Sequence, residues 1–367
     1  MKYFLIAGEA SGDLHGANLI AAIKQKDPSA IFNYWGGDRM QAQAPGLLNH
    51  YKDVTIMGFV EVLLNLNKIF SNLWLCKAQI DAFNPDVVVL IDYPGFNLRI
   101  AEYCKSIGIR VVYYIAPKVW AWKENRAKKL EKFVDDLLII FPFEVDYFKK
   151  WKVKTHFVGN PLCDEIAQYK FTTRFKENNK IDERPIIALL PGSRKQEIKR
   201  MLPVMIEATK QLTSYQLVIA GAPGISESFY KPWLSNRLHL VFNQTYDLLK
   251  NSDAAIVCSG TATLETALLL VPQVCVYAGH PLSYFIAKQL VKVKYISLVN
   301  LCMDKPAIKE LIQFDVTAEK MRKELNMVLP GGLKNSSLLN DYDTLQKLIG
   351  GTGASLRAAE IIVQVPF

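Results

Sequence analysis

Residues 87–97 have the sequence VVVLIDYPGFN, an uninterrupted apolar run that ends in a polar turn. A run of consecutive branched aliphatic residues is typical of a strand buried on both faces, as in a parallel sheet covered by helices. Asp92 follows the run directly. Because ligands of open parallel sheets bind outside the carboxyl ends of the strands, we expect Asp92 to face a ligand site.

Short apolar runs alternate with helical patterns along the whole chain, which predicts an α/β protein with two Rossmann-like domains facing a cleft. The strands are expected in two series, at residues 3–7, 31–35, 87–91, 111–115, 137–141 and 156–158, and then at residues 186–190, 217–220, 238–242, 254–258 and 273–277. The polar segment 164–184 separates the two series, so we expect domains of residues 1–163 and 164–345. Helical patterns at residues 338–349 and 354–363 have no strand of their own. They are expected to pack back across the domain seam, with residues 346–367 returning to the N-terminal domain.

The composition excludes several classes of protein. Half of the 367 residues are hydrophobic and 22% are charged, which provides apolar material for two cores and excludes intrinsic disorder. Neither an apolar window of about 18 residues nor the pattern of a signal peptide is present, so we expect no membrane span and no leader. The six cysteines form no C-x-x-C pair, which favours a reduced, cytoplasmic protein.

The first expected strand is followed by GEASGDLHG at residues 8–16 and then by a helical pattern. Its glycines are four residues apart, so the dinucleotide fingerprint G-x-G-x-x-G is absent. Glu9 and Asp13 are expected beside Asp92, which is our first candidate for a general base. Two alternatives remain open, namely that Asp13 caps the helix and that Asp92 caps the turn through Pro94 and Gly95.

A second candidate loop is LPGSRKQE at residues 190–197. Ser193 and Gln196 have the spacing of a capping box, which predicts a helix that starts there. Arg194 would then lie at the helix N-terminus, where a guanidinium and free N–H groups suit a diphosphate. The alternative is that Arg194 is a solvated surface residue.

The third loop, CSGTATLE at residues 258–265, follows an apolar strand. Its small residues let a backbone approach a ligand closely, and several carry hydroxyls: Ser259, Gly260, Thr261, Ala262 and Thr263. Glu265 could accept hydrogen bonds from sugar hydroxyls. Such residues also occur where a helix packs tightly on a sheet. With one such loop in the first domain and two in the second, we expect a ligand between the domains.

Metal chemistry is not indicated. The five histidines show no pairing at i+3 or i+4, and no thiol cluster accompanies them. The D-x-D motif at residues 341–343 follows a polar loop instead of an apolar strand, so we expect no metal there.

Residues 57–75 carry more apolar surface than one buried helix stripe requires, which is typical of an interaction site. The residues expected to contact lipid are Val60, Leu63, Leu66, Phe70, Leu73 and Trp74. Lysines and arginines gather with tryptophans at residues 118–132 and 149–154, which fits anionic headgroups better than nucleic acid because no nucleic-acid module is present. A helix buried on two sides and a solvated basic face are the alternatives.

Several motifs together resemble the lipid A disaccharide synthase family, in order and over nearly the whole length. They are GEASGDLHG (8–16), IDYPGFN (91–97), YYIAPKVWAW (113–122), LLPGSRKQEI (189–198) and SGTATLE (259–265). The resemblance implies a membrane-associated glycosyltransferase of the B-type fold (GT-B) in lipid A biosynthesis. It implies inverting transfer from UDP-2,3-diacylglucosamine to 2,3-diacylglucosamine 1-phosphate, which forms a β(1→6) disaccharide 1-phosphate and UDP.

The same resemblance implies roles for single residues. Asp92 would accept the proton of the acceptor's 6-hydroxyl, and Glu265 would hold the ribose. Donor contacts would also come from Ser193, Arg194, residues 259–263 and Asn300, and acceptor contacts from Ser11, Lys118 and Arg126. No metal or cofactor is implied, and we expect the protein at the cytoplasmic leaflet of the inner membrane, where it contacts anionic lipids but no nucleic acid. The oligomeric state stays open. A UDP-sugar epimerase of the same fold and a non-catalytic protein that binds nucleotide or lipid at the membrane are the competing hypotheses.

Overall fold

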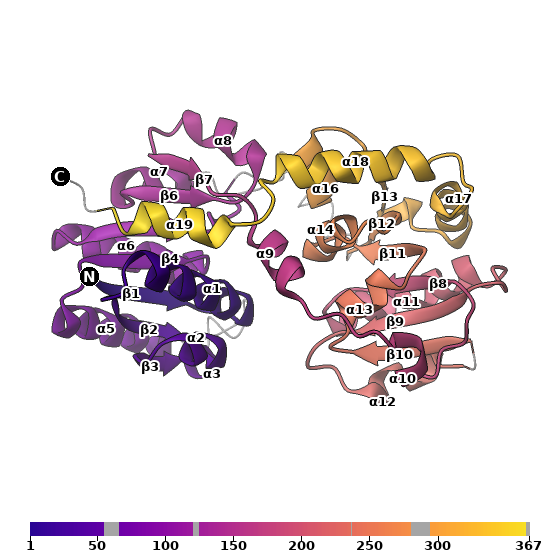
Figure 1. Ribbon diagram of the computed structural model, residues 1–367, viewed down its shortest axis with the longest axis horizontal. Coiled ribbons are helices and arrows are strands. Elements are labelled where there is room, and N and C mark those ends of the chain that lie inside the picture. Colours follow the sequence, from indigo (N-terminus) through magenta and orange to yellow (C-terminus); the bar gives the residue numbers. More distant parts are fainter. Residues whose placement is uncertain (55–65, 120–124, 236, 280–293, 365–367) are drawn as a thin grey trace. The chain divides into compact units, whose positions relative to one another are not determined.

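The computed structural model describes residues 1–54, 66–119, 125–235, 237–279 and 294–364 (Figure 1). The chain forms two compact units, unit 1 with Met1–Asp164 and Ile349–Phe367, and unit 2 with Glu165–Leu348. The expected boundaries after residues 163 and 345 lie within three residues of these divisions.

Unit 1 is built on a seven-stranded parallel sheet with the order β3-β2-β1-β4-β5-β6-β7. Its strands are β1 (Lys2–Ala7), β2 (Ile31–Gly36), β3 (Leu47–His50), β4 (Val87–Ile91), β5 (Arg110–Tyr114), β6 (Asp136–Ile139) and β7 (Thr155–Phe157). The apolar run 87–91 is the fully buried strand β4, which pairs with β1 on one side and β5 on the other. Every pairing is parallel, as the continuous apolar strands predicted.

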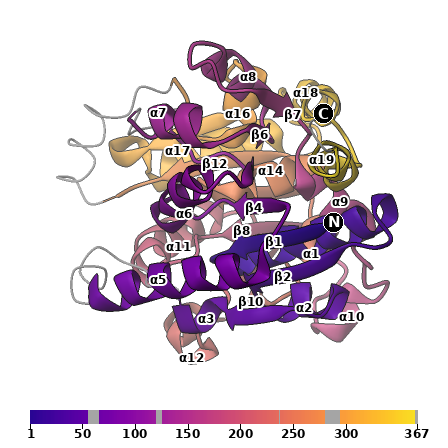
Figure 2. The ribbon, with the colours of Figure 1, turned by 90° about the vertical axis from the view of Figure 1, so that its left-hand side faces the viewer.

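Helices cover both faces of this sheet. They are α1 (Ala10–Lys26), α2 (Asp38–Gln43), α3 (Tyr51–Val54), α5 (Leu66–Phe83), α6 (Pro94–Ser106), α7 (Asn125–Phe133), α8 (Pro142–Lys149) and α19 (Ala354–Ile362), and α9 (Pro161–Gln168) crosses the unit boundary. One core cluster joins α5, α6 and α7 to alternate residues of the strands, among them Phe4, Ile6, Val88 and Leu90. Helices α1 and α19 pack against each other, and Figure 2 shows them on the opposite side of the sheet from α6.

Unit 2 contains a six-stranded parallel sheet with the order β10-β9-β8-β11-β12-β13. The strands are β8 (Ile186–Leu190), β9 (Gln216–Gly221), β10 (Leu238–Phe242), β11 (Ala254–Cys258), β12 (Gln273–Tyr277) and β13 (Lys309–Ile312). The helices are α10 (Phe175–Asn178), α11 (Lys195–Thr209), α12 (Glu227–Tyr230), α13 (Thr245–Lys250), α14 (Thr261–Leu268), α16 (Leu298–Met303), α17 (Ala318–Val328) and α18 (Asn335–Leu348). Short 3₁₀ turns occupy Lys231–Trp233 and Gln313–Asp315.

The two C-terminal helices belong to different units. We expected both to pack back across the seam, but only α19 joins unit 1, whereas α18 packs on α14, α16 and α17 within unit 2. Helix α18 stays because its core residue Tyr342 is fully buried there and receives a hydrogen bond from Gln273 (3.3 Å).

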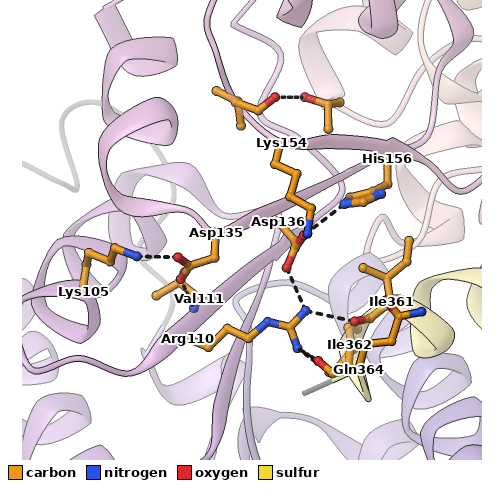
Figure 3. Close-up of polar contacts among 12 residues, drawn as sticks. Lys105, Arg110, Val111, Asp135, Asp136, Lys154, His156, Ile361, Ile362 and Gln364 are labelled. Atoms are coloured by element: carbon orange, nitrogen blue, oxygen red, sulfur yellow. Dashed lines mark hydrogen bonds and ion pairs between the residues drawn. The ribbon is translucent and has the colours of Figure 1, made fainter. Parts of the chain in front are cut away.

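Both ends of α19 are fixed to unit 1. At its start, the Asp164 carboxylate accepts hydrogen bonds from the N–H groups of Gly353 and Ser355. At its end, the Arg110 guanidinium donates to the carbonyls of Ile361 (2.9 Å), Ile362 (2.8 Å) and Gln364 (2.6 Å) and pairs with Asp136 (2.7 Å; Figure 3). Arg110 thus supplies donors to carbonyls that a helix end leaves unpaired.

No helix within the described residues is both long and apolar enough to cross a lipid bilayer.

Candidate active site

The sheet of unit 1 reverses its strand order between β1 and β4, and the candidate catalytic residues follow these two strands. Ala7 and Ile91 are paired in register, so Gly8 and Glu9 leave the sheet beside Asp92. In open α/β sheets this switch point is where ligands bind. Glu9 lies close enough to Asp92 for the two charges to interact. Burial, followed by the charge of Asp92, therefore raises the pKa of Glu9.

Asp92 and Tyr93 both adopt the left-handed backbone conformation, with φ of 44° and 50°. Such a conformation costs on the order of 1–3 kcal/mol for a residue other than glycine and persists only where the surroundings hold it. The Asp92 carbonyl accepts hydrogen bonds from the Tyr113 hydroxyl (2.5 Å) and from Asn97 Nδ2 (2.8 Å). The Asp92 N–H donates to the Tyr114 carbonyl (3.0 Å). The turn is therefore fixed from three sides.

The environment of Asp92 makes its carboxylate a stronger proton acceptor than a free aspartate. Burial raises the pKa of Asp92, and this effect outweighs the charge of Lys118, a hydrogen bond from the Tyr93 N–H and the charge of Arg126, which lower it. Lys118 is exposed and Arg126 is half-buried. The structure thus places Lys118 and Arg126, two residues expected to contact the acceptor sugar, close enough to Asp92 for their charges to affect its pKa.

Asp13 has a structural role that its place in the first loop did not predict. Its carboxylate is buried and accepts hydrogen bonds from the N–H groups of Gly37 (2.7 Å), Arg39 (3.1 Å) and Met40 (3.1 Å). These donors lie at the start of α2, so Asp13 caps that helix from the first turn of α1. Because its oxygens are occupied, we do not place Asp13 in the chemistry.

Helix α1 starts earlier than a cap at Asp13 would imply. Its first residue is Ala10, and Glu9 precedes it as the N-cap residue. Glu9 and Ser11 are both exposed on this turn, where an acceptor substrate could reach them.

In unit 2 the strand order reverses between β8 and β11, and the two candidate donor loops follow these strands. Val257 of β11 pairs with Leu190 of β8. A side chain added at Gly192 would lie 3.5 Å from Cys258 Sγ, which shows how closely the loops approach each other. The structure therefore brings the LPGSR and CSGT segments together at a second switch point.

The helix after LPGSR starts one residue later than Ser193 and Gln196 predicted. Its first residue is Lys195, and the cap comes from Glu197, whose Oε2 accepts from the N–H groups of Ser193 and Arg194 (3.2 Å each). The Arg194 side chain is 83% exposed and approaches Glu197 at 3.4 Å. A pair this exposed is weak, so the guanidinium can turn to an incoming diphosphate.

Helix α14 begins in open space. Nothing lies within 4 Å of a side chain added at Gly260, and Thr261 is exposed, while Ala262 is half-buried. Two of the hydroxyl groups expected to contact the ligand already have partners within the protein. Ser259 Oγ donates to the Ile296 carbonyl (2.9 Å), and Thr263 Oγ1 donates to the Gly260 carbonyl (2.8 Å). The N–H groups at the helix start are thus better candidates for phosphate contacts than these two hydroxyls.

Glu265 lies one turn into α14, beside Glu165 and Tyr246 of the same unit. Burial, followed by the charge of Glu165, raises the pKa of Glu265 to about 7. A carboxyl group in this state gains from hydroxyl donors that stabilise its charged form.

Asn300, which was expected to contact the nucleotide, instead forms hydrogen bonds within the protein. Its amide is buried, donates to the Ile308 carbonyl and to Glu310 (2.9 Å each), and accepts from the Ile308 N–H (2.9 Å). Glu310 also accepts from the N–H groups of Ile296 and Ser297. Asn300 therefore holds the segment that contacts Ser259, and a direct contact with nucleotide stays a prediction.

The apolar face expected for the lipid splits into two in α5. Leu73 is buried in the core with Cys76 and Ile80, whereas Phe70 and Trp74 are 64% and 73% exposed. A broad apolar arc can serve two surfaces, and the sheet covers only one side of this helix. Val60 and Leu63 lie outside the described residues, as does the side chain of Leu66.

Metal ligands do not gather in the described part of the chain, where no group of three or more His, Cys, Asp or Glu side chains could hold an ion. In the D-x-D motif, Asp341 pairs with Lys305 (2.6 Å) and Tyr342 is buried.

A cavity of about 520 Å³ lies away from Asp92, at the amino ends of strands β5 and β6. It is lined by charged side chains that pair with one another, such as Lys105 with Asp135 and Lys154 with Asp136 (2.9 Å; Figure 3). Arg110, which also lines the cavity, fixes the end of α19, so we assign the cavity to the fold.

Comparison with known proteins identifies the family. The sequence matches the family described as lipid-A-disaccharide synthetase over residues 3–360. The chain belongs to the lipid-A-disaccharide synthase family. A lipid-A-disaccharide synthase of Myxococcus xanthus is 35% identical over 99% of this chain and 97% of the relative. That of Syntrophus aciditrophicus is 36% identical over 97% of this chain and 95% of the relative.

Solved structures show the fold shared beyond this family. The UDP-GlcNAc 2-epimerase of Neisseria meningitidis bound to UDP-GlcNAc matches with a TM-score of 0.71 at 13% identity, covering 99% of this chain and 100% of that chain. The glycosyltransferase of kitacinnamycin matches with a TM-score of 0.68 at 12% identity, covering 98% of each chain. The expected GT-B architecture and the family resemblance are thereby confirmed.

Proposed function

We propose that this chain transfers a 2,3-diacylglucosamine residue from UDP to 2,3-diacylglucosamine 1-phosphate, forming a β(1→6)-linked disaccharide 1-phosphate and UDP. Membership of the lipid-A-disaccharide synthase family supports the reaction. The observation that carries the mechanism is the partly buried carboxylate of Asp92, which stands on a turn with a fixed backbone at the switch point of unit 1.

In the proposed step, Asp92 accepts the proton of the acceptor's 6-hydroxyl as that oxygen attacks the anomeric carbon of the donor. The bond between this carbon and the UDP oxygen breaks on the opposite side, so an α-linked donor gives a β-linked product. Lys118 and Arg126 lie near Asp92 and can contact the acceptor phosphate. Glu9 faces the same space as a second carboxylate.

Unit 2 supplies the donor site. The start of α14 and the Arg194 guanidinium stabilise the negative charge that develops on the leaving diphosphate. Glu265 accepts hydrogen bonds from the ribose hydroxyls. These groups provide charge stabilisation without a metal ion.

The acyl chains of both substrates place the reaction at a membrane surface. We propose that the protein binds peripherally to the cytoplasmic leaflet through Phe70 and Trp74 of α5, which are exposed, and through the basic residues around α7 and α8.

The decisive experiment combines both acylated substrates with purified protein and identifies the product by mass spectrometry and its anomeric configuration by NMR. A β-linked disaccharide 1-phosphate with equimolar UDP is expected. Asp92→Asn should lower kcat by about 10²–10⁴, the range of a general base. Glu102→Gln, which changes an exposed acid of the same unit, is the matched control and should leave kcat unchanged. An α-linked product, free 2-epimerised UDP-sugar, or full activity of Asp92→Asn would overturn the proposal.

The pH dependence tests the same assignment. A general base must be ionised, and the pKa of Asp92 is raised by burial, so kcat at saturating concentrations of both substrates should fall with decreasing pH at a midpoint above that of an ordinary aspartate. Asp92→Asn should lose this acid limb.

Metal independence is tested with a chelator. Millimolar EDTA should leave the rate within about a factor of two, since helix and guanidinium groups neutralise the diphosphate. Strong inhibition that added Mg²⁺ reverses would show that the donor needs an ion.

A further inference from the structure

The turn that carries Asp92 has an unusual backbone conformation, which neighbouring side chains hold in place. Two consecutive residues other than glycine have positive φ, and Pro94 follows them as the first residue of α6. The proline ring favours an extended conformation at Tyr93, so the observed left-handed conformation has to be held by the surrounding structure. The position of the Asp92 carboxylate thus depends on how this turn is fixed.

Two buried side chains converge on the Asp92 carbonyl. The Tyr113 hydroxyl of β5 donates to it at 2.5 Å, and Asn97 Nδ2 of α6 donates at 2.8 Å. Asn97 Nδ2 also approaches the carbonyls of Ile91 (3.3 Å) and Ile6 (3.5 Å), so it links the ends of β4 and β1. Both side chains have no exposed surface.

The ring of Tyr93 fixes the other half of the turn. It covers Gly8, where an added side chain would lie 2.3 Å from Tyr93 Cγ, and it stacks on Phe96 with 5.6 Å between ring centres. Phe96 in turn contacts Trp35. The loops after β1 and β4 are therefore packed together at the base of the site.

We propose that Tyr113 and Asn97 are positioning residues that hold the Asp92 carbonyl and thereby direct the Asp92 carboxylate to the acceptor hydroxyl. This inference rests on the proposed role of Asp92 as general base. Neither side chain exchanges a proton with substrate. Burial raises the pKa of the Tyr113 phenol far above its usual value, so the hydroxyl remains a donor at every working pH.

The test is Tyr113→Phe, which removes one hydrogen bond and keeps the ring. We expect kcat to fall about 10- to 100-fold, as a displaced catalytic group does, with KM for either substrate changed less than about threefold. The acid limb of kcat should also move to lower pH, because a carboxylate released toward solvent loses the effect of burial. Asn97→Ala should give the same pattern.

The matched control is Tyr34→Phe in β2, since Tyr34 is also fully buried and donates to a backbone carbonyl, that of Ala44 (2.6 Å). It should lower the unfolding temperature about as much as Tyr113→Phe but leave kcat and the acid limb unchanged. If both variants behave alike in kcat and pH profile, the positioning role is wrong.

The double variant Asp92→Asn with Tyr113→Phe separates this inference from the proposed function. If Tyr113→Phe lowers kcat only by displacing Asp92, the double variant should be no slower than Asp92→Asn. If the two substitutions act independently, their losses of kcat should multiply. If Asp92→Asn keeps full activity, the general-base proposal fails; if it is slowed as expected and the losses multiply, only the positioning role fails.

Discussion

Two carboxyl groups, Asp92 in unit 1 and Glu265 in unit 2, are partly withdrawn from water, and burial raises the pKa of each. The same physical cause suits different tasks. A base gains proton affinity from burial, whereas a ligand for hydroxyl groups becomes fully charged only when those hydroxyls replace the lost water.

The pKa of Glu265 predicts that UDP binding depends on pH. Because the pKa is about 7 in the free protein and hydroxyl donors favour the charged form, binding should be tighter at pH 8 than at pH 6, by up to about tenfold for each pH unit below the pKa. Isothermal titration calorimetry with Glu265→Gln is the comparison. The phosphate of UDP titrates equally in both experiments, so the difference between the proteins reports Glu265. Equal pH dependence of the two proteins would remove Glu265 from the site.

Gly8 is expected to tolerate no side chain. An alanine there would meet the Tyr93 ring at 2.3 Å, so Gly8→Ala should cost about 1–3 kcal/mol of unfolding free energy in urea denaturation. The matched control is Gly95→Ala in α6, where nothing lies within 4 Å. That change should be neutral or stabilising by up to about 1 kcal/mol, since alanine is the better helix residue. Equal losses at both positions would show that the Tyr93 ring moves freely.

At the scale of elements, α5 presents one face to the core and another to solvent. Leu73, Cys76 and Ile80 are buried, while Phe70 and Trp74 stand one turn apart on the exposed side. Exposed aromatic side chains this close together are typical of contact with another apolar surface.

Replacing Phe70 and Trp74 with serine should lower binding to anionic liposomes by at least about tenfold in a flotation assay, because each ring contributes about 1.5–3 kcal/mol when buried. Stability should change by less than about 0.5 kcal/mol per site, as both side chains are exposed. The control is the Phe314→Ser and Leu333→Ser pair of unit 2, which are 73% and 88% exposed. Unchanged flotation of the α5 variant, or an equal loss in the control, would contradict a lipid contact through α5.

The elements with regular apolar patterns could be predicted from the sequence, and those defined by pairing could not. The runs 87–91, 186–190, 238–242, 254–258 and 273–277 are strands with the expected bounds. Strands β3 and β13 were not expected, because each is a four-residue edge strand with polar residues, LLNH and KELI.

The same distinction applies to the candidate site. Asp92, Arg194 and Glu265 could be proposed from their places after strands. The tasks of Asp13 and Asn300 could not, because they depend on backbone groups of α2 and of the segment before β13 that no local pattern specifies. Tyr113 and Asn97 belong to conspicuous motifs, but their common target is a carbonyl, which the sequence does not distinguish from any other.

At the scale of the whole molecule, unit 1 is completed by a helix from the far end of the chain. Helix α19 packs on α1, and Lys26 pairs with Glu360 (2.7 Å) between them. The buried Asp136 joins the end of this helix to the sheet through Arg110, with Lys154 and His156 as further partners (Figure 3).

This cluster should contribute strongly to stability. Burial alone would raise the pKa of Asp136, but hydrogen bonds from Arg110, Lys154 and His156 outweigh it and lower the pKa to about 2. A depressed pKa stabilises the fold above the unfolded value near 4, and the contribution disappears as the pH falls through about 2. Arg110→Ala should cost about 3 kcal/mol in urea unfolding at neutral pH, because it removes one of two cations from the buried Asp136 and the donor of three carbonyls at the end of α19. Lys105→Ala, in the more solvent-exposed pair with Asp135, should cost less than about 1 kcal/mol. Similar costs for the two variants would contradict the proposed weight of the Arg110 contact.

The discontinuity of unit 1 has a consequence for biosynthesis. Residues 165–348 separate Asp164 from Ile349, so the sheet of unit 1 leaves the ribosome long before its last helix is made. At about 5–20 residues per second the delay is roughly 10–40 s. During that interval the apolar surface of α1 is uncovered, and Arg110 and Asp136 lack the helix end that they later hold. We therefore expect the nascent N-terminal unit to be prone to aggregation until α19 is made, and a ribosome stall within unit 2 to prolong that state.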